Sequence, residues 1–565
     1  MSRTVSPLGR SSTPFAARLV ARTLLVALAL VPVVARAETC APNCQFLTAQ
    51  DVTDAVRAAA TAISPANVVI AVVDRAGVPL GVYEGTAGAA AALIAGNLAN
   101  ITTLLYQGGP PAGITGVPAG DYAVGLARTG AFFSNNQAPL SSRTVRFISG
   151  IHFPPGITNK PNAALYGIEN TNRGCSFNVP AGSPIDNVPR ATSLNGGACG
   201  AGAGVAGCGT GIVTGKRDIF DSDPAAVDGG GVPIFKGGQV VGGIGVTGVG
   251  IDRNVTEFAA LIGSVLGGDP RFGPRLADPG VIFLDGIALP FVKNTVRPPG
   301  VGTGVFNAAG FIVGPIASPN AGNGVPHGYL FGPVASTTPS PAAGGLTQVE
   351  VQNIVDSARR QADDTRAAIR LPLGSSTRMM ISVGDAAGNL LAIFRMPDAT
   401  IFSIDVSVAK ARNAAYFSSR TRNPIDLPGV PLGTAVTART ISFGAQPLFP
   451  AGIDQTRSGP FFGDFRTDVA NPCTQGFQAA NANQSGIVFF PGSIGLYRGR
   501  TDLIGGLGVS GDGVEQDDFV TAAGVSLGTA QPNNFVPASE IRADRVIIGD
   551  VRLPFFKFPR NPETR

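Results

Sequence analysis

The sequence predicts an α+β protein made of two copies of one domain, each an antiparallel sheet flanked by helices, which pack together as a pseudo-dimer. Two observations carry this prediction. The 565 residues include 76 glycines and 45 prolines but only 14% charged residues, which favours short strands and turns over helical bundles or coiled coils. The same motifs also occur twice in the same order, which indicates an internal repeat.

Each copy opens with a predicted helix. Thr48 and Thr347 are the expected N-caps, because an acidic residue, Asp51 or Glu350, stands three positions later and can return the hydrogen bond. Apolar residues then recur at the same helical spacing in both copies.

A predicted hairpin and a second predicted helix follow in each copy. The hairpins are VVIAVVDRAGVPLGVYE (68–84) and MMISVGDAAGNLLAIFR (379–395), two apolar runs around a turn that contains glycine. The helices carry LARTGAFFS (126–134) and KARNAAYFS (410–418), which are identical at five of nine positions. Such matches in a fixed order indicate a duplication.

A glycine-rich strand comes later in each copy, VGGIGVTG (241–248) and IGGLGVSG (504–511). Because glycine has no side chain, another backbone or a flat ligand can approach such a strand closely. A short helix and a closing strand are expected to complete each copy.

These motifs divide the chain into four segments, with a long loop insert at about 158–230 in the first domain. The expected segments are a signal peptide (1–37), a first domain (38–292), a Gly/Pro-rich linker (293–343) and a second domain (344–565).

The charge of the chain gives no support to a nucleic-acid partner. The formal net charge is +5, but residues 1–37 hold five arginines and no acidic residue, so the remainder is neutral. A neutral protein has no global field that attracts nucleic acid or an anionic membrane.

Residues 1–37 combine an arginine-bearing start, an apolar stretch and small residues at the end, which is typical of an export signal. The apolar stretch is shorter than the roughly 20 residues that a membrane-spanning helix needs. We therefore expect a periplasmic or secreted protein that keeps no membrane span after the signal is cleaved.

The six cysteines of an exported chain are expected to form disulfides. The candidates are the near neighbours Cys40 and Cys44, the near neighbours Cys199 and Cys208, and the pair Cys175 and Cys473. Cys175 and Cys473 stand in corresponding loops, which can meet if the copies pack about a pseudo-twofold axis. We hypothesise a bridge between them; two free thiols or a different pairing are the alternatives.

Two runs of the second copy carry a recognisable signature, VGDAAGNLLAIFRMPDATIFSIDVSVAKARNAAYFSS (383–419) and GGLGVSGDGVEQDDF (505–519). They contain an Asp-x-x-Gly hairpin, an Arg-Met turn, Ser-x-Asp and a helix with Lys-Ala. The positions are Asp385, Gly388, Arg395, Met396, Ser403, Asp405, Lys410 and Ala411. In these elements the chain resembles the GlcG/HbpS-like haem-binding domain family over most of 346–528.

The resemblance implies a compact, profilin-like α+β fold that usually assembles into oligomers, so a homo-oligomer is expected unless the tandem copies build the dimer internally. It also implies that the small-molecule partner is haem or a related tetrapyrrole. The first copy has Leu126 in place of Lys410 and lacks the Arg-Met turn. If the family site needs these residues, the first copy is a structural partner only.

Four residues are candidates for binding that tetrapyrrole: His152, His327, Met396 and Lys410. Haem iron is usually held by His, Cys, Met or Tyr. The chain has two histidines, and His152 is the first candidate for the iron ligand; a packed side chain is the other interpretation, because its counterpart is Leu448. Lys410 could pair with a haem propionate, and a buried ion pair with Asp405 is the alternative.

The expected function is an exported protein that binds haem or another tetrapyrrole between an apolar helix and a glycine-rich strand, and so sequesters or senses it. The sequence contains no H-E-x-x-H or P-loop motif, which disfavours an enzyme. Two alternatives stay open: a structural or interaction protein that keeps the fold without a ligand, and an enzyme that acts on a small hydroxy acid.

Overall fold

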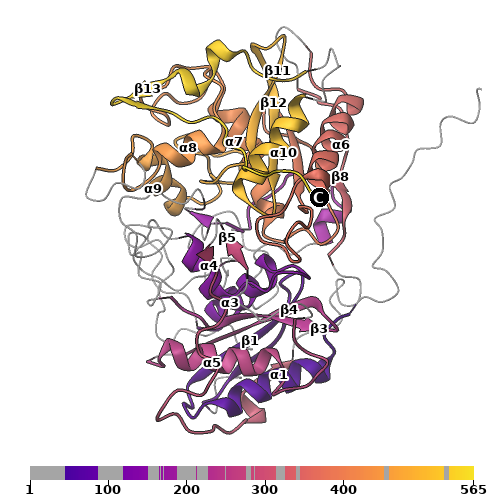
Figure 1. Ribbon diagram of the computed structural model, residues 1–565, viewed down its shortest axis with the longest axis vertical. Helices are drawn as coiled ribbons and strands as arrows, with labels where there is room; N and C mark the ends of the chain where they lie inside the picture. The colour runs from indigo at the N-terminus through magenta and orange to yellow at the C-terminus, as the bar shows by residue number, and fades with distance from the viewer. Residues whose placement is uncertain are drawn as a thin grey trace, which may run out of the picture. The chain divides into compact units, whose positions relative to one another are not determined.

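Two five-stranded antiparallel sheets form the framework of the protein (Figure 1). The first is ordered β3 (Gly231–Lys236), β4 (Gln239–Gly248), β1 (Val68–Asp74), β2 (Pro79–Glu84) and β7 (Phe311–Val313). The second is ordered β11 (Ser493–Arg498), β12 (Asp502–Ser510), β9 (Met380–Asp385), β10 (Leu390–Arg395) and β8 (Gly328–Phe331). Strands that correspond in the sequence therefore take corresponding places.

The computed structural model describes residues 45–86, 119–149, 165, 167–168, 171–172, 174–187, 212, 227–248, 250–274, 282–284, 287–313, 325–338, 344–450, 457–526 and 534–564. Residues 37–565 form one compact unit that contains both sheets.

Helices cover both faces of the first sheet. Its central strand β1 is buried along its whole length, and alternate residues point to opposite faces. Val68, Ile70 and Val72 pack with α1 (Ala49–Ala62) and α5 (Arg253–Ser264). Val69 and Ala71 belong to the cluster that contains α3 (Ala119–Phe133). The short helix α4 (Ser142–Ser149) follows α3.

The second sheet is covered in the same way. The α6 (Gln348–Asp364) and α10 (Val514–Ser526) helices pack in one hydrophobic cluster with Ile381 and Val383 of β9. The α7 helix (Ser403–Phe417) lies on the other face, where Ser407 Oγ is 2.8 Å from Ser382 Oγ. Helices α8 (Ala438–Gly444) and α9 (Phe462–Ala470) follow α7 along the chain.

Both predicted capping boxes form, and they confirm where the two repeats begin their first helix. The amide of Asp51 donates to Thr48 Oγ1, and the amide of Glu350 donates to Thr347 Oγ1, at 3.2 Å in each case. The two carboxylates return the hydrogen bond to the amides of their threonines. The same local chemistry therefore starts α1 and α6.

The Gly/Pro-rich segment between the copies adds a strand to each sheet. Strand β7 pairs with β2, and β8 pairs with β10, both antiparallel. The sequence suggests only a connector here, because strands of three and four residues are too short to show an alternating pattern.

Each copy ends in a two-stranded ribbon where the sequence predicts a single closing strand. The ribbons are β5 (Phe283–Leu284) with β6 (Ile287–Ala288), and β13 (Ile547–Ile548) with β14 (Val551–Arg552). In the second ribbon Gly549 and Asp550 both have positive φ, which is what a tight hairpin turn requires. Short helical turns at η2 (Pro184–Asn187), η4 (Ala308–Gly310), η5 (Ser539–Ile541) and η6 (Ala543–Arg545) complete the elements.

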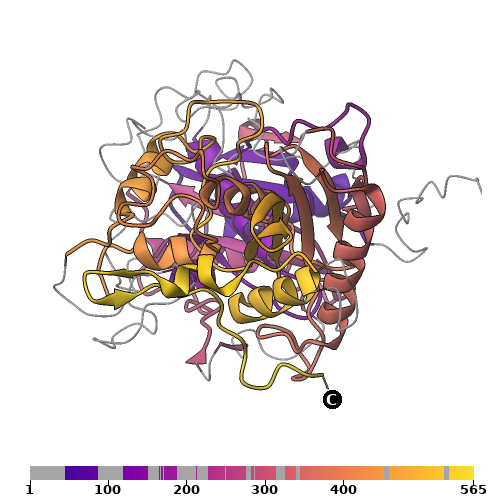
Figure 2. The same ribbon diagram turned by 90° about the horizontal axis from the view of Figure 1, so that it is seen from above.

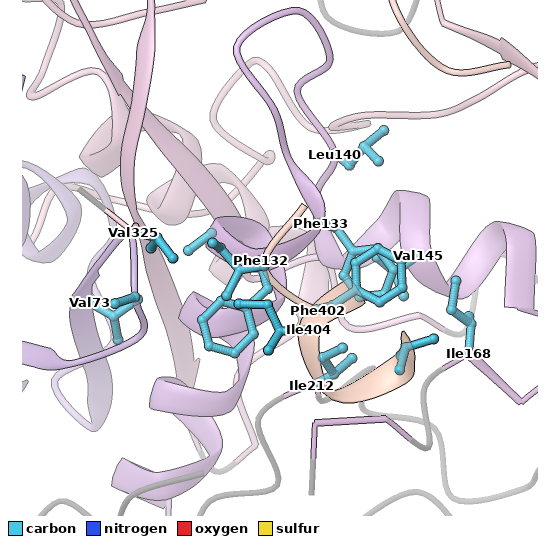
Figure 3. Close-up of a cluster of buried hydrophobic side chains, with 14 of the residues drawn as sticks. Val73, Phe132, Phe133, Leu140, Val145, Ile168, Ile212, Val325, Phe402 and Ile404 are labelled. Atoms are coloured by element: carbon cyan, nitrogen blue, oxygen red, sulfur yellow. The ribbon is translucent and has the colours of Figure 1, made fainter. Parts of the chain in front are cut away.

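One hydrophobic cluster contains residues of both halves (Figure 3). The rings of Phe133, from the end of α3, and Phe402, from the start of α7, stack with centroids 4.1 Å apart. Beside them the amide of Ile401 donates to the carbonyl of Phe132 at 2.9 Å. The two halves are therefore joined by an ordinary protein core, as a pseudo-dimer requires.

Equivalent residues make equivalent polar contacts in the two halves. Arg128 Nε donates to the carbonyl of Gly77 at 2.8 Å, and Arg412 Nε donates to that of Gly388 at 3.0 Å. Three further contacts of the first half have a counterpart in the second. The ion pair Arg143–Glu257 corresponds to Arg439–Asp518, and the ion pair Lys236–Asp51 corresponds to Arg498–Glu350. The hydrogen bond Thr144–Pro290 corresponds to Thr440–Pro554. The internal repeat therefore extends from the sequence to individual hydrogen bonds.

Candidate functional site

The glycine-rich strands do not leave a slot for a flat ligand. A Cβ atom added at Gly508 would overlap the carbonyl oxygen of Ser407, and one at Gly506 would overlap that of Ala411. Both carbonyls belong to α7, so the backbone of this helix lies directly on β12. The expected ligand position between helix and glycine-rich strand is wrong: the glycines admit the helix backbone itself.

Lys410 is buried and lines none of the cavities found among the described residues. Its side chain is 0% exposed, and Nζ donates to the carbonyl of Val509 at 2.8 Å and to Asp517 at 2.9 Å. Nζ also lies 4.8 Å from the centre of the Phe490 ring. The expected partner Asp405 is therefore wrong, and the partner is Asp517, which comes more than a hundred residues later in the chain.

The Lys410–Asp517 pair is specific to the second copy. The matched ion pairs Arg143–Glu257 and Arg439–Asp518 align α5 with α10, so that Thr256 stands at the place of Asp517. Leu126 stands at the place of Lys410. Burial raises the pKa of Asp517 to about 7, against the lowering effect of Lys410, and burial lowers the pKa of Lys410. A buried charge pair in one copy thus replaces two neutral residues in the other.

Met396 lies in the core of the second half. It is 2% exposed, and its sulfur accepts a hydrogen bond from the amide of Met379 at 3.3 Å. Its side chain belongs to the hydrophobic cluster that contains residues of α6 and of the second sheet. The structure gives Met396 a packing role.

Of the two histidines, only His327 lies among the described residues. His327 is half-buried and comes directly before β8, where Arg395 holds the carbonyls of Val325 and Pro326. His152 lies outside the described residues.

A disulfide joins Cys175 to Cys473, with their Cα atoms 5.4 Å apart. This confirms the hypothesised bridge between the two corresponding loops. The other four candidates, Cys40, Cys44, Cys199 and Cys208, lie outside the described residues.

The described part of the second half has a groove of about 690 Å³ at the start of α10, which we call the C-terminal groove. Its walls are Arg366 and Ala367, which follow α6, the first turn of α10, and the segment 557–561 near the end of the chain. Thr564 donates to the carbonyl of Asp364 at 2.9 Å and so holds this end against α6 (Figures 1 and 2).

The C-terminal groove is cationic with one exposed ring. Arg366, Lys557 and Arg560 line it, and Lys557 pairs with Glu515, the one acidic lining residue. Phe558 is 48% exposed. The N-terminus of α10 adds a positive backbone dipole at the same place. Carboxylates of a ligand would be stabilised here, and an apolar ring could pack on Phe558.

A second cavity, of about 330 Å³, lies beside the β9–β10 hairpin, and we call it the amide pocket. Five amide side chains line it, together with Arg412, Tyr416 and the ring of Phe477: Asn423, Gln475, Gln478, Asn481 and Asn483. The sequence run 471–484 is rich in Asn and Gln, which is the sequence signal that could have indicated this pocket.

Buried carboxyl groups lie behind the amide pocket. Tyr416 donates its hydroxyl to Asp426 at 2.5 Å. Asp464, on α9, is 1% exposed, and neither of its carboxyl oxygens has a hydrogen-bond partner. Burial raises the pKa of Asp464 to about 9; Asp426 and Asp468 raise it further, and Arg422 opposes them.

The high pKa of Asp464 predicts a loss of stability with rising pH. The folded protein keeps this proton up to about pH 9, whereas an ordinary carboxyl releases it near pH 3.8. Because the native state binds the extra proton, the free energy of unfolding falls between these limits. Asp464→Asn is expected to remove about 2–4 kcal/mol of the decline between pH 5 and pH 8, measured by urea unfolding. An equal decline in the variant and the wild type would contradict this.

Comparison with protein families finds a match for most of the second half of the chain. Residues 346–526 match the family described as haem degrading protein HbpS-like. This part of the chain is therefore similar to an HbpS-like domain. The matched span contains the second sheet apart from β8, the helices α6 to α10, the amide pocket and part of the C-terminal groove.

Several solved structures are similar to a part of the chain. They include a PduOC:heme complex, 22% identical, which covers 33% of this chain and 99% of its own at a TM-score of 0.21. The Klebsiella pneumoniae protein ORFY is 20% identical, covers 34% of this chain and 97% of its own, and has a TM-score of 0.22. A double mutant of Streptomyces reticuli HbpS is 16% identical, with 34% and 99% covered and a TM-score of 0.19.

No curated protein matches the sequence. Within the described ranges, no helix combines the length and apolar character that a membrane crossing needs. In the same residues, no three His, Cys, Asp or Glu side chains are grouped so that they could hold a metal ion.

Proposed function

We propose that the protein binds haem or a related tetrapyrrole, with its HbpS-like domain as the binding half. The match of residues 346–526 with a family of haem proteins carries this proposal. The C-terminal groove supports it, because a volume of about 690 Å³ lies in the range of cofactor pockets, roughly 300–1,000 Å³.

The described residues of the groove can bind the propionate edge of a haem, but they include none of the usual iron ligands. The guanidinium groups of Arg366 and Arg560 have no side-chain partner among the described residues, so they can receive two propionates as charge-assisted hydrogen bonds. Phe558 offers an apolar face. Bound haem would supply a redox-active iron, and this chain's residues would hold and orient the porphyrin.

The iron ligand must come from elsewhere in the chain. None of the described residues that line the groove is a His, Cys, Met or Tyr, the usual ligands of haem iron. Met396 and the two disulfide-bonded cysteines are already engaged. We therefore propose His152 as the ligand and keep His327 as the second choice.

We further propose that the protein works after export and sequesters or senses haem there. The arginine-bearing apolar leader supports export, and so does the Cys175–Cys473 disulfide, since such bonds persist in oxidising compartments.

The test is a titration of the purified mature protein with hemin. A saturable, shifted Soret band is expected. Arg366→Ala combined with Arg560→Ala should weaken binding roughly tenfold, because two charge-assisted contacts are lost. Arg359→Ala, an exposed arginine of α6 outside the groove, is the matched control and should leave affinity unchanged.

The two histidine variants test the ligand separately. His152→Ala should change the Soret position, whereas His327→Ala should not. A band that is untouched by His152→Ala would remove this ligand but leave binding in place. If hemin gives no saturable band with the wild type, the proposed function is wrong.

A further inference from the structure

The amide pocket is a built site that haem binding in the C-terminal groove does not use. It lies on the hairpin side of the second sheet, between the end of α7 and the loop that carries Gln475 to Asn483. The two cavities share no lining residue. A ligand of the pocket would therefore have its own chemistry.

In its described lining, the amide pocket offers a ligand no charged group that is free to pair with it. Arg412 is its one charged residue, and this side chain is 1% exposed. The guanidinium already donates to the carbonyls of Gly388, Ser176 and Phe177. The other polar groups of the lining are uncharged: the five amides, and the hydroxyls of Ser419 and Thr421, which are hydrogen-bonded to each other.

One of these amides is buried and has an unused donor. Gln475 is 3% exposed, and its Nε2 has no hydrogen-bond partner. A buried donor left without an acceptor is destabilising, because it has lost the hydrogen bond to water that it makes in the unfolded chain. An acceptor on a ligand in the pocket would satisfy this group, so the site is better matched to a bound ligand than to an empty cavity.

The pocket also has an apolar wall. Phe477 is 46% exposed, and the ring of Tyr416 is held in place because its hydroxyl is bound to Asp426. Ligand pockets commonly combine aromatic faces with a few fixed polar groups that set orientation.

The amide-bearing loop is anchored to the first half of the chain. The Cys175–Cys473 disulfide holds its start, and Asn178 Nδ2 donates to Asn483 Oδ1 at 2.7 Å near its end. A binding wall fixed at both ends loses little conformational freedom when a ligand binds.

In the described residues of the first half, an aromatic ring fills the corresponding place. Phe132 takes the place of Tyr416, and a Cβ added at Gly77 would overlap its ring. In the first half the aromatic ring therefore packs over the hairpin glycine. In the second half Tyr416 is bound to Asp426 instead, and the cavity lies open.

From these features we propose that the amide pocket binds an uncharged, hydroxyl-rich ligand of the size of a mono- or disaccharide. Amides and hydroxyls can pair with sugar hydroxyls in both directions, and the aromatic wall can pack on the C–H face of a sugar ring. A volume of about 330 Å³ limits the ligand to this size.

The test is isothermal titration of the full mature protein, with its disulfide intact, against glucose, maltose and cellobiose. Gluconate and glucosamine serve as the charged comparison. Saturable binding of at least one neutral sugar is expected, with neither charged sugar binding more tightly. Gln475→Ala should weaken binding roughly three- to tenfold, the effect of one lost hydrogen bond.

Two further variants separate binding from folding. Asn481→Ala changes an exposed lining residue and should also weaken binding, while Gln50→Ala, an exposed amide on α1, should not. No heat of binding from any neutral sugar at millimolar concentration would overturn the proposal, and so would affinities that Gln475→Ala and Asn481→Ala leave unchanged. The hemin spectrum reports on the other cavity, so the two proposals can fail independently.

Discussion

Replacing Lys410 by leucine is expected to lower the free energy of unfolding by about 3–5 kcal/mol. The side chains of Lys410 and Asp517 are 0% and 3% exposed, so the change leaves a carboxyl buried without its partner. The pKa of Asp517, already raised to about 7 by burial, would rise further, and the carboxyl would take up a proton near neutral pH. Urea unfolding at pH 7 measures the effect.

The first copy of the repeat supplies the compensating change. Lys410→Leu together with Asp517→Thr recreates the Leu126 and Thr256 combination, in which neither side chain is charged. Replacing a whole buried pair by neutral residues is often neutral or stabilising, so the double variant should return to within about 1–2 kcal/mol of the wild type.

An exposed pair is the control for this cycle. Arg359→Met removes a partner of Asp363 whose side chain is 41% exposed, and the loss should stay below about 1 kcal/mol. If the double variant is as unstable as Lys410→Leu alone, the two positions are not coupled as the contacts indicate.

A valine at Gly508 is expected to destabilise the protein by about 3 kcal/mol or more. Its Cβ would overlap the carbonyl of Ser407, and α7 would have to move away from β12 to make room. Overpacking of this kind usually costs about 1–3 kcal/mol, and more where the obstacle is a helix backbone. Gly245→Val should do the same in the first half, because its Cβ would overlap the carbonyl of Ala123 on α3.

Gly384→Ala on the neighbouring strand β9 is the matched control. The nearest atom to its added Cβ is the carbonyl oxygen of Asn389 at 3.5 Å, an ordinary contact. The change should alter stability by less than about 1 kcal/mol. A Gly508→Val protein as stable as this control would show that a slot does exist between α7 and β12.

Local patterns account for the parts of the fold that the sequence predicts. The caps at Thr48 and Thr347, and the hairpins around Gly77 and Gly388, depend on residues within a few positions of each other. The strands β7 and β8 were missed because each is defined by its pairing with β2 or β10 rather than by its own sequence.

The site was harder to predict because it depends on distant partners. The bond between Lys410 and Asp517 joins residues 107 positions apart, and no local pattern favours Asp517 over Asp405. The glycines of β12 allowed either a ligand or a helix, and only packing decides between them. The C-terminal groove combines Arg366 with Arg560, which no motif connects.

The most direct test of the account is the position of the iron in crystals of the hemin complex, measured by anomalous scattering. The account predicts one iron per chain, in a haem that lies at the C-terminal groove. The propionates of this haem contact Arg366 and Arg560. An iron in a porphyrin that does not contact Arg366 and Arg560, one between α7 and β12, or no ordered iron in a fully loaded complex would contradict it.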